Sequence, residues 1–172
     1  MSEAGAALLK GTTMQRRVVW QGAAALGMLV WAGGARAHHG WARFDQNRPI
    51  YLEGTAVSVQ WRNPHAELVL ELPAELALPA DLARRALPAQ VAAVDGPGLL
   101  AKAVLPRRRD RRWQVELAPL TRMSQWSVPE IAAGARVGVL GFTFDEERGD
   151  PVLRAEFLFL DGKAYGLRSA PA

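Results

Sequence analysis

Apolar and polar residues alternate in several short stretches of this chain, a pattern typical of β-strands that bury one face. The clearest stretch is residues 66–72, Ala-Glu-Leu-Val-Leu-Glu-Leu, and a longer β-prone stretch at residues 49–60 precedes it, with Gly54 as a bend or bulge. Asn63-Pro64 between the two stretches is a turn signal. The pattern therefore predicts a β-hairpin with His65 at its tip.

Further strands are predicted at residues 113–117, 136–144 and 152–160, with a short last strand near Tyr165. A short helix is predicted between the third and fourth strands, capped by Ser124 or Ser127, with Pro129 in its first turn and Gly134 at its end. Residues 145–150 read as a charged, polar hairpin tip. The order β-β-β-α-β-β predicts an all-β fold with one short helix, namely a small, five- to six-stranded OB-like (oligonucleotide/oligosaccharide-binding) β-barrel.

Residues 73–112 interrupt the alternation. This stretch is rich in Ala, Leu, Arg and Pro and ends in a cluster of arginines at 107–112. We expect an extended surface insertion with short helical pieces at 80–87 and 99–104, because the cost of closing a loop grows slowly with its length. The arginine cluster predicts a solvated loop or, alternatively, a contact with an anionic lipid or polyanion.

Residues 1–37 have the features of an export signal. Arg16-Arg17 precedes an apolar run at 18–32, and Ala35-Arg36-Ala37 has the small-x-small form of a signal-peptidase site. The run is shorter than the ~20 residues of a membrane span, so we expect cleavage after Ala37, no transmembrane span afterwards, and a single periplasmic or secreted domain at 38–172. A retained N-terminal anchor is the alternative, and the arginine pair also fits a twin-arginine signal loosely.

Composition narrows the classes of function. Of the 21 basic and 17 acidic side chains, four basic and one acidic lie within residues 1–37, which leaves 17 and 16 in the mature chain. This near balance argues against a nucleic-acid binder, which carries a strong basic field. The chain has no cysteine, so disulfides and thiolate ligands are excluded.

Several motifs resemble a family of short exported bacterial proteins, catalogued as domain of unknown function 6152. They are His-His-Gly-Trp-Ala-Arg-Phe-Asp at 38–45, Pro-Ile-Tyr-Leu-Glu-Gly-Thr at 49–55, Trp-Arg-Asn-Pro-His at 61–65 and Ile-Ala-Ala-Gly-Ala-Arg-Val at 131–137. The resemblance spans about residues 37–72 and 113–165 and skips the insertion. It implies export and a small β domain, and it carries no established activity.

All three histidines lie at two places, His38-His39 and His65. Cleavage after Ala37 would give His38 a free amine, and that amine and its imidazole could chelate one metal ion. A third nitrogen from His65 would complete a nearly planar set, which suits copper best among common divalent ions. His39 would be a further ligand or an outer partner.

Other interpretations of the histidines remain open. Cleavage one residue earlier would place His39 third, where the amine, two amides and its imidazole could enclose Cu(II) or Ni(II). The histidines could instead belong to a disordered tail and an ordinary turn. Trp41, Trp61 and Trp113 could line the same region or simply fill the barrel.

No catalytic triad, phosphate loop, dinucleotide fingerprint or zinc-type spacing is present. We therefore expect no enzyme; a copper oxygenase would need an open coordination position and a substrate surface, and neither is evident. The sequence predicts an exported copper-binding module. The alternative is a non-metal module of the cell envelope that binds a partner protein or a glycan.

Overall fold

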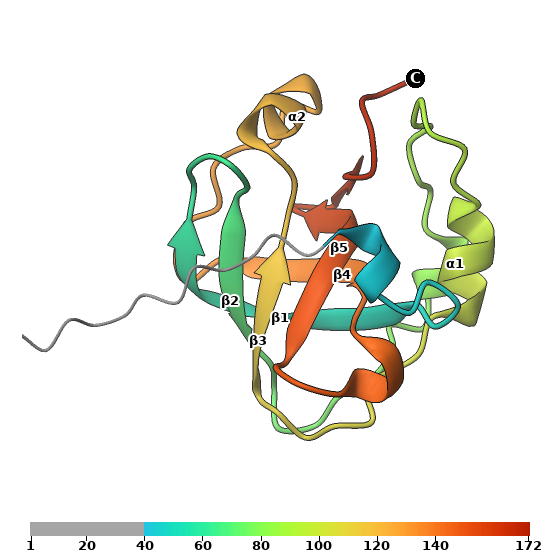
Figure 1. Cartoon of the computed structure of the whole chain (residues 1–172), viewed down its shortest axis with the longest axis vertical. Helices are drawn as coiled ribbons and strands as arrows, with labels where there is room; N and C mark the ends of the chain where they lie inside the picture. The colour runs from blue at the N-terminus through green and yellow to red at the C-terminus, as the bar shows by residue number, and fades with distance from the viewer. Residues whose placement is uncertain (1–39) are drawn as a thin grey trace, which may run out of the picture. The chain divides into compact units, whose positions relative to one another are not determined.

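The computed structural model describes residues 40–172, which form one six-stranded sheet and a few short helices (Figure 1). The strands are β1 (Ile50–Gln60), β2 (Glu67–Glu71), β3 (Arg112–Glu116), β4 (Arg136–Phe142), β5 (Val152–Leu160) and β6 (Lys163–Gly166). The α-helices are α1 (Gly96–Lys102) and α2 (Leu120–Gln125), and the single 3₁₀ turns are η1 (Trp41–Arg43), η2 (Leu82–Arg84) and η3 (Asp145–Glu147). The predicted signal segment, His38 and His39 lie outside the described residues.

The sheet closes on itself. Its strand order is β3-β2-β1-β4-β5-β6, and a further pairing joins β3 to β5. The β3–β5 pairing is parallel and the others are antiparallel, so the first five strands form a barrel and β6 extends it beyond β5. The predicted small all-β, OB-like barrel is confirmed.

Strand β1 pairs with two neighbouring strands, each along a different part of its length. Its first half pairs with β4, its second half pairs with β2, and a register shift between Ala56 and Ser58 marks a bulge. A Cβ added at Gly54 would lie 2.2 Å from the carbonyl oxygen of Glu71. Only glycine allows this close backbone approach at position 54, whereas the bulge itself lies two residues later than the predicted position.

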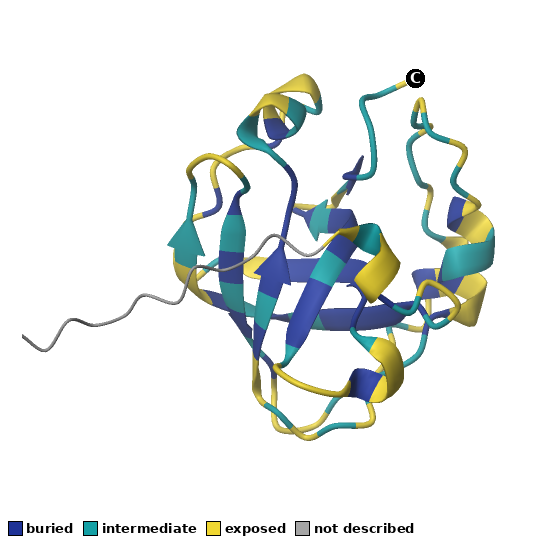
Figure 2. Ribbon diagram, viewed as in Figure 1, coloured by how far each residue is buried: buried dark blue, intermediate teal, exposed yellow. Residues whose placement is uncertain are grey.

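The barrel is filled by the inward-facing residues of the alternating strands, and the burial colours of Figure 2 follow this pattern. Leu68, Leu70, Val115 and Leu153 are each at most 2% exposed. The residues between them face outward, as a pleated strand requires. Within residues 40–172, no helix is long and apolar enough to cross a bilayer.

The helix between β3 and β4 exists, but it begins and ends earlier than expected. Helix α2 spans Leu120–Gln125, whereas the predicted cap at Ser124 or Ser127 was wrong: Ser124 is inside the helix and Ser127 follows it with φ 52°. Val128 then donates its amide hydrogen to the Met123 oxygen (2.9 Å). This hydrogen bond returns the chain to the core, where Val128 is buried.

The segment 73–112 is more than a surface loop. Leu82 of η2 and Leu100 of α1 are buried in a second apolar cluster against Tyr51, Leu140 and Phe157, which face outward from the barrel. Its two regular pieces, η2 and α1, lie near the predicted helical stretches but are shorter or shifted. The segment therefore covers one outer face of the barrel, at the right of Figure 1.

Candidate functional site

His65 lies in the connection from β1 to β2, after a cis Asn63–Pro64 bond, and is half-buried. Both backbone polar groups of the next residue, Ala66, are hydrogen-bonded. Its N–H donates to the Ala118 oxygen (3.1 Å) and its oxygen accepts from the Leu117 N–H (2.9 Å). The backbone at His65 is thus one residue from the β2–β3 ladder. The predicted hairpin is confirmed, but His65 lies near the β2 end of its connection, after the bend at Asn63-Pro64, rather than at the tip.

A row of polar side chains crosses the outside of the barrel on the same side. In the strand registers, Glu67 of β2 lies opposite Glu116 of β3, and Glu116 lies opposite Arg154 of β5. The Arg154 guanidinium is 3.0 Å from the Glu116 carboxylate, and Glu67 accepts from the Gln114 amide (3.2 Å). Strand spacings of ~4.8 Å place Glu67 about 10 Å from Arg154 across the sheet.

Trp41, the first described residue that has a side chain, is anchored at this row. Trp41, in η1, has the Arg154 guanidinium carbon 5.2 Å from its ring centre and that of Arg168 at 3.6 Å. Its ring edge also meets Phe142, with centroids 6.3 Å apart. In Figure 1 the η1 turn lies against β5, as these contacts require. We call Trp41, Arg154 and Arg168 the Trp41 clamp.

A buried carboxylate holds Arg168 of the Trp41 clamp in place. Glu156 is fully buried and accepts from Arg168 Nε (2.7 Å). Gln46 accepts from both terminal nitrogens of Arg168 (3.1 Å each), and Gln90 accepts from the Arg168 backbone N–H (3.0 Å). Because Glu116 and Glu156 each neutralise one arginine, the clamp presents little net positive charge.

Of the predicted metal ligands, the structure describes only His65; His38 and His39 lie outside the described residues. Among residues 40–172, no three His, Cys, Asp or Glu side chains gather closely enough to hold a metal ion. The copper site formed with His38 or His39 therefore stays a prediction.

Trp41, Trp61 and Trp113, which the sequence suggested could line one region, do not share one surface. Trp113 is fully buried, and its indole N–H donates to the Asp110 oxygen (3.1 Å), so it fills the barrel. Trp61 is half-buried and packs against the main core, beside the His65 connection. Only Trp41 is held by arginines on the polar row.

Hydrogen bonds join the arginine cluster at 107–112 to the charged loop at 145–150. Glu147 is only 8% exposed, not part of a polar tip, and its carboxylate accepts from the backbone N–H groups of Arg107 and Arg108 (2.9–3.0 Å) and pairs with Arg48. Burial opposes ionisation of Glu147, but these amides and the Arg48 guanidinium outweigh it and hold its pKa below the usual value. The Arg108 guanidinium donates to the oxygens of Glu147 and Gly149. Much of the cluster is therefore structural.

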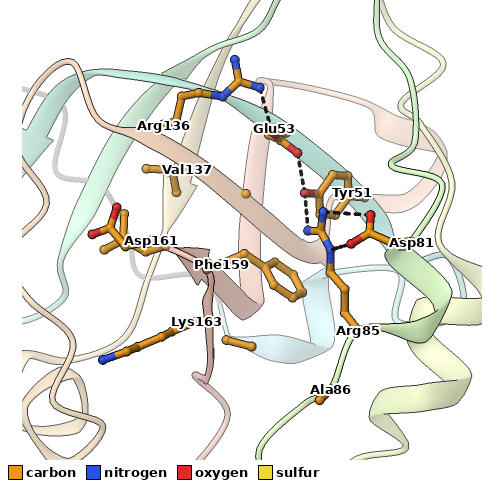
Figure 3. Close-up of a pocket in the computed structure, with 14 residues that line it drawn as sticks. Tyr51, Glu53, Asp81, Arg85, Ala86, Arg136, Val137, Phe159, Asp161 and Lys163 are labelled. Atoms are coloured by element: carbon orange, nitrogen blue, oxygen red, sulfur yellow. Dashed lines mark hydrogen bonds and ion pairs between the residues drawn. The ribbon is translucent and has the colours of Figure 1, made fainter.

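A second polar site lies outside the barrel between β1 and the insertion, in a pocket of about 430 Å³ (Figure 3). The Tyr51 hydroxyl donates to Glu53 (2.8 Å) and accepts from Arg85 (3.0 Å). Glu53 also accepts from Arg136 (2.7 Å), and Arg85 makes a two-point pair with Asp81 (3.1 and 3.3 Å). We call these five side chains the Tyr51 network.

The network changes the acidity of its members. Burial, followed by the hydrogen bond to Glu53, raises the pKa of Tyr51 to about 12. The Arg136 hydrogen bond holds the pKa of Glu53 below its usual value, although partial burial opposes this. Tyr51 therefore remains a neutral phenol and Glu53 a carboxylate at neutral pH. The sequence carries no signal for this role of Glu53, because Arg85 and Arg136 reach the network from distant segments.

Comparison with known proteins agrees with the resemblance drawn from the motifs. A family of unknown function, DUF6152, matches residues 26–78. The resemblance is confirmed over this segment. The DUF6152 match contains both histidine positions and the β1–β2 hairpin, whereas β3 to β6 lie beyond it. No curated protein and no solved structure matches the chain significantly.

Proposed function

We propose that the protein is exported and that its mature form binds one copper ion through His38 and His65, in the handling or delivery of the metal. The observation that carries this proposal is the Trp41 clamp, which anchors the chain three residues after His38 on the same polar row as the His65 hairpin. The export step rests on the signal-like residues 1–37.

The lengths involved are compatible. Three residues span at most about 10 Å at ~3.3–3.6 Å per residue. The distance across the sheet from Arg154 to Glu67 is also about 10 Å, and the two residues from Glu67 back to His65 add about 7 Å along the strand, for a span of about 12 Å. An extended segment that starts at Trp41 and runs toward β2 would cover most of this span, and the two imidazole side chains would have to cover the remainder.

The chemistry of the ligands favours Cu(II). The amine and imidazole of His38 would form one chelate ring, and the His65 imidazole would supply the third nitrogen. The neighbouring arginines are already paired with carboxylates, so they repel a cation less than free guanidinium groups would. His39 would remain outside the plane of the three nitrogens, as an outer partner.

The test is a Cu(II) titration of the processed protein and of single-residue variants, followed by electron paramagnetic resonance. The intact mass first establishes whether His38 is the N-terminus. We expect His38→Ala and His65→Ala each to weaken binding by about tenfold or more. Arg62→Ala, an exposed change in the same connection, is the matched control and should bind like the wild type.

The alternative cleavage register makes a different prediction. If Ala37 is retained, His39→Ala abolishes binding and His65→Ala has no effect, because all four nitrogens then come from the first three residues. Affinity that is unchanged in the His38, His39 and His65 variants, or no binding at all, would refute the copper proposal. The non-metal interaction module would then be the remaining hypothesis.

Tryptophan fluorescence gives an independent measurement. Copper bound beside the Trp41 clamp should quench emission from Trp41, while Trp113 is shielded within the barrel. Trp41→Phe should therefore reduce the copper-dependent quenching, and Trp61, which lies beside the His65 connection, should account for the remainder. Equal quenching in the wild type and in Trp41→Phe would place any bound copper away from the clamp.

A further inference from the structure

The pocket beside the Tyr51 network is separate from the His65 row and is formed by distant parts of the chain. Tyr51 and Glu53 come from β1, Arg136 from β4 and Phe159 from β5, while Arg85 reaches in from the insertion. Its volume of about 430 Å³ is within the range of sites that hold small molecules, roughly 300–1,000 Å³. Figure 3 shows these side chains surrounding one hollow.

The pocket has a shaped floor and an apolar wall. A Cβ at Gly138 would lie 2.7 Å from the Tyr51 hydroxyl oxygen, so the phenol lies directly over this glycine. The rings of Tyr51 and Phe159 meet edge to face with centroids 6.0 Å apart, and the Arg85 guanidinium carbon lies 5.2 Å from the Phe159 centre. These contacts hold the wall in one arrangement before any ligand arrives.

The charges at the wall are already compensated. Arg85 is paired with Asp81, and Arg136 is paired with Glu53. Asp161 and Lys163 bring one charge of each sign to the rim from the β5–β6 turn. The lining thus has three cationic and three anionic side chains, so a charged ligand would gain no net attraction and would have to compete with existing ion pairs.

Hydrogen-bonding capacity remains, however. A guanidinium group has five N–H donors and a carboxylate accepts several hydrogen bonds, so the Tyr51 network does not exhaust Arg85, Arg136 or Glu53. Donors and acceptors therefore lie side by side in fixed positions, next to an aromatic ring. This combination complements a molecule that carries many hydroxyl groups and no charge.

We infer that this pocket binds a small, neutral, polyhydroxylated molecule of the size of a monosaccharide. The hydroxyl groups of the ligand would bond to Arg85, Arg136 and Glu53, and its C–H face would pack on Phe159. The inference does not depend on the copper proposal, because none of its residues belongs to the Trp41 clamp or the β1–β2 connection.

The experiment is a two-dimensional ¹H–¹⁵N NMR titration of the processed protein with four probes at millimolar concentration. Glucose and N-acetylglucosamine are neutral, whereas glucosamine and glucuronate carry one charge each. We expect the neutral sugars to shift the amide signals of β1, β4 and the β5–β6 turn, and the charged sugars to bind more weakly.

Two variants distinguish a binding site from a structural contact. Ala86→Trp places a large side chain at an exposed position of the pocket lining and should abolish the shifts. Ala83→Trp, three residues earlier and also exposed but outside the lining, is the matched control and should retain them. Tyr51→Phe removes the hydroxyl that holds Arg85 and Glu53 in position, so it should weaken binding while the NMR spectrum remains that of a folded protein.

Three results would overturn the inference. They are the absence of shifts with both neutral sugars, shifts that survive Ala86→Trp, and tighter binding of either charged sugar than of the neutral pair. Copper titration of the same samples keeps the two proposals apart, because Ala86→Trp should leave copper binding unchanged.

Discussion

Replacing Glu156 with Gln tests whether the buried ion pair with Arg168 holds the Trp41 clamp together. The substitution keeps the shape of the side chain and removes its charge. Glu156 is fully buried and lies 2.6 Å from Arg168 Nη2, while the Arg168 side chain is 23% exposed. Gln46 and the Trp41 ring would still contact the guanidinium.

The size of the effect follows from this partial exposure. Removing one partner of a fully buried pair costs about 3–5 kcal/mol, and exposed pairs are worth about 1 kcal/mol or less. Since Arg168 is partly solvated and keeps other contacts, we expect Glu156→Gln to reduce the free energy of unfolding by about 2 kcal/mol.

The assay is urea denaturation in a double-mutant cycle with Arg168→Met, followed by tryptophan emission and circular dichroism. We expect a coupling energy of about 2 kcal/mol. The Glu71–Arg112 pair, with a 3.1 Å separation and a 70% exposed arginine, is the matched control and should give less than about 1 kcal/mol. Equal coupling in the two cycles would refute the role assigned to burial.

The cycle also bears on function. If the contact of Arg168 with Trp41 positions the segment that follows His38, Glu156→Gln should weaken Cu(II) binding under conditions in which the protein is still fully folded. The Glu71→Gln control should not. Full copper affinity in Glu156→Gln would mean that the clamp does not position the metal ligands.

Three further predictions concern other parts of the structure. The chain has two tyrosines, so a Tyr165→Phe variant reports Tyr51 alone, and its absorbance at alkaline pH should titrate near pH 12. The stability that the raised pKa of Tyr51 contributes is complete below about pH 10 and should be lost as the pH rises toward 12. A titration midpoint near that of the unfolded chain, while circular dichroism still shows a folded barrel, would contradict the Tyr51 network. Glu147 has a lowered pKa, so its contribution is present above about pH 4.5 and is lost on further acidification; Glu147→Gln should flatten the acid part of the stability curve measured with urea, and an unchanged curve would count against the amide contacts. Gly54→Ala should lower the free energy of unfolding measured in urea by about 1–3 kcal/mol, because the added Cβ would clash with the backbone of Glu71. Gly40→Ala is the control and should be neutral, because a Cβ there would have no atom within 4 Å. Similar stabilities of the two variants would show that β1 tolerates a side chain at position 54.

The sequence predicted the strands well because alternation directly records which side of a strand is buried. The predicted stretches at 49–60, 66–72 and 152–160 correspond to β1, β2 and β5 within a residue or two. The helix between β3 and β4 was predicted in the right interval but in the wrong place. A Ser-x-Pro start signal is local, whereas the actual end of α2 is set by the return of Val128 to the core.

Charge patterns in the sequence were less informative. Glu147 looked like one more residue of a polar tip, yet it is buried because backbone amides 40 positions away meet its carboxylate. Arg85 and Arg136 carried no signal for a shared pocket, since they lie in the insertion and in β4. Such partners are far apart along the chain and leave no periodic trace.

The sequence by itself determined the succession of strands along the chain, the β1–β2 hairpin and the presence of His65 in its connection, because these depend on alternation, turn residues and neighbours close along the chain. Only the tertiary structure decided that β3 joins β5, that Arg154 and Arg168 hold Trp41, and that the insertion buries one outer face of the barrel. These features depend on contacts between segments that become neighbours only when the sheet closes, and such contacts require complementary surfaces rather than a repeating pattern of residues.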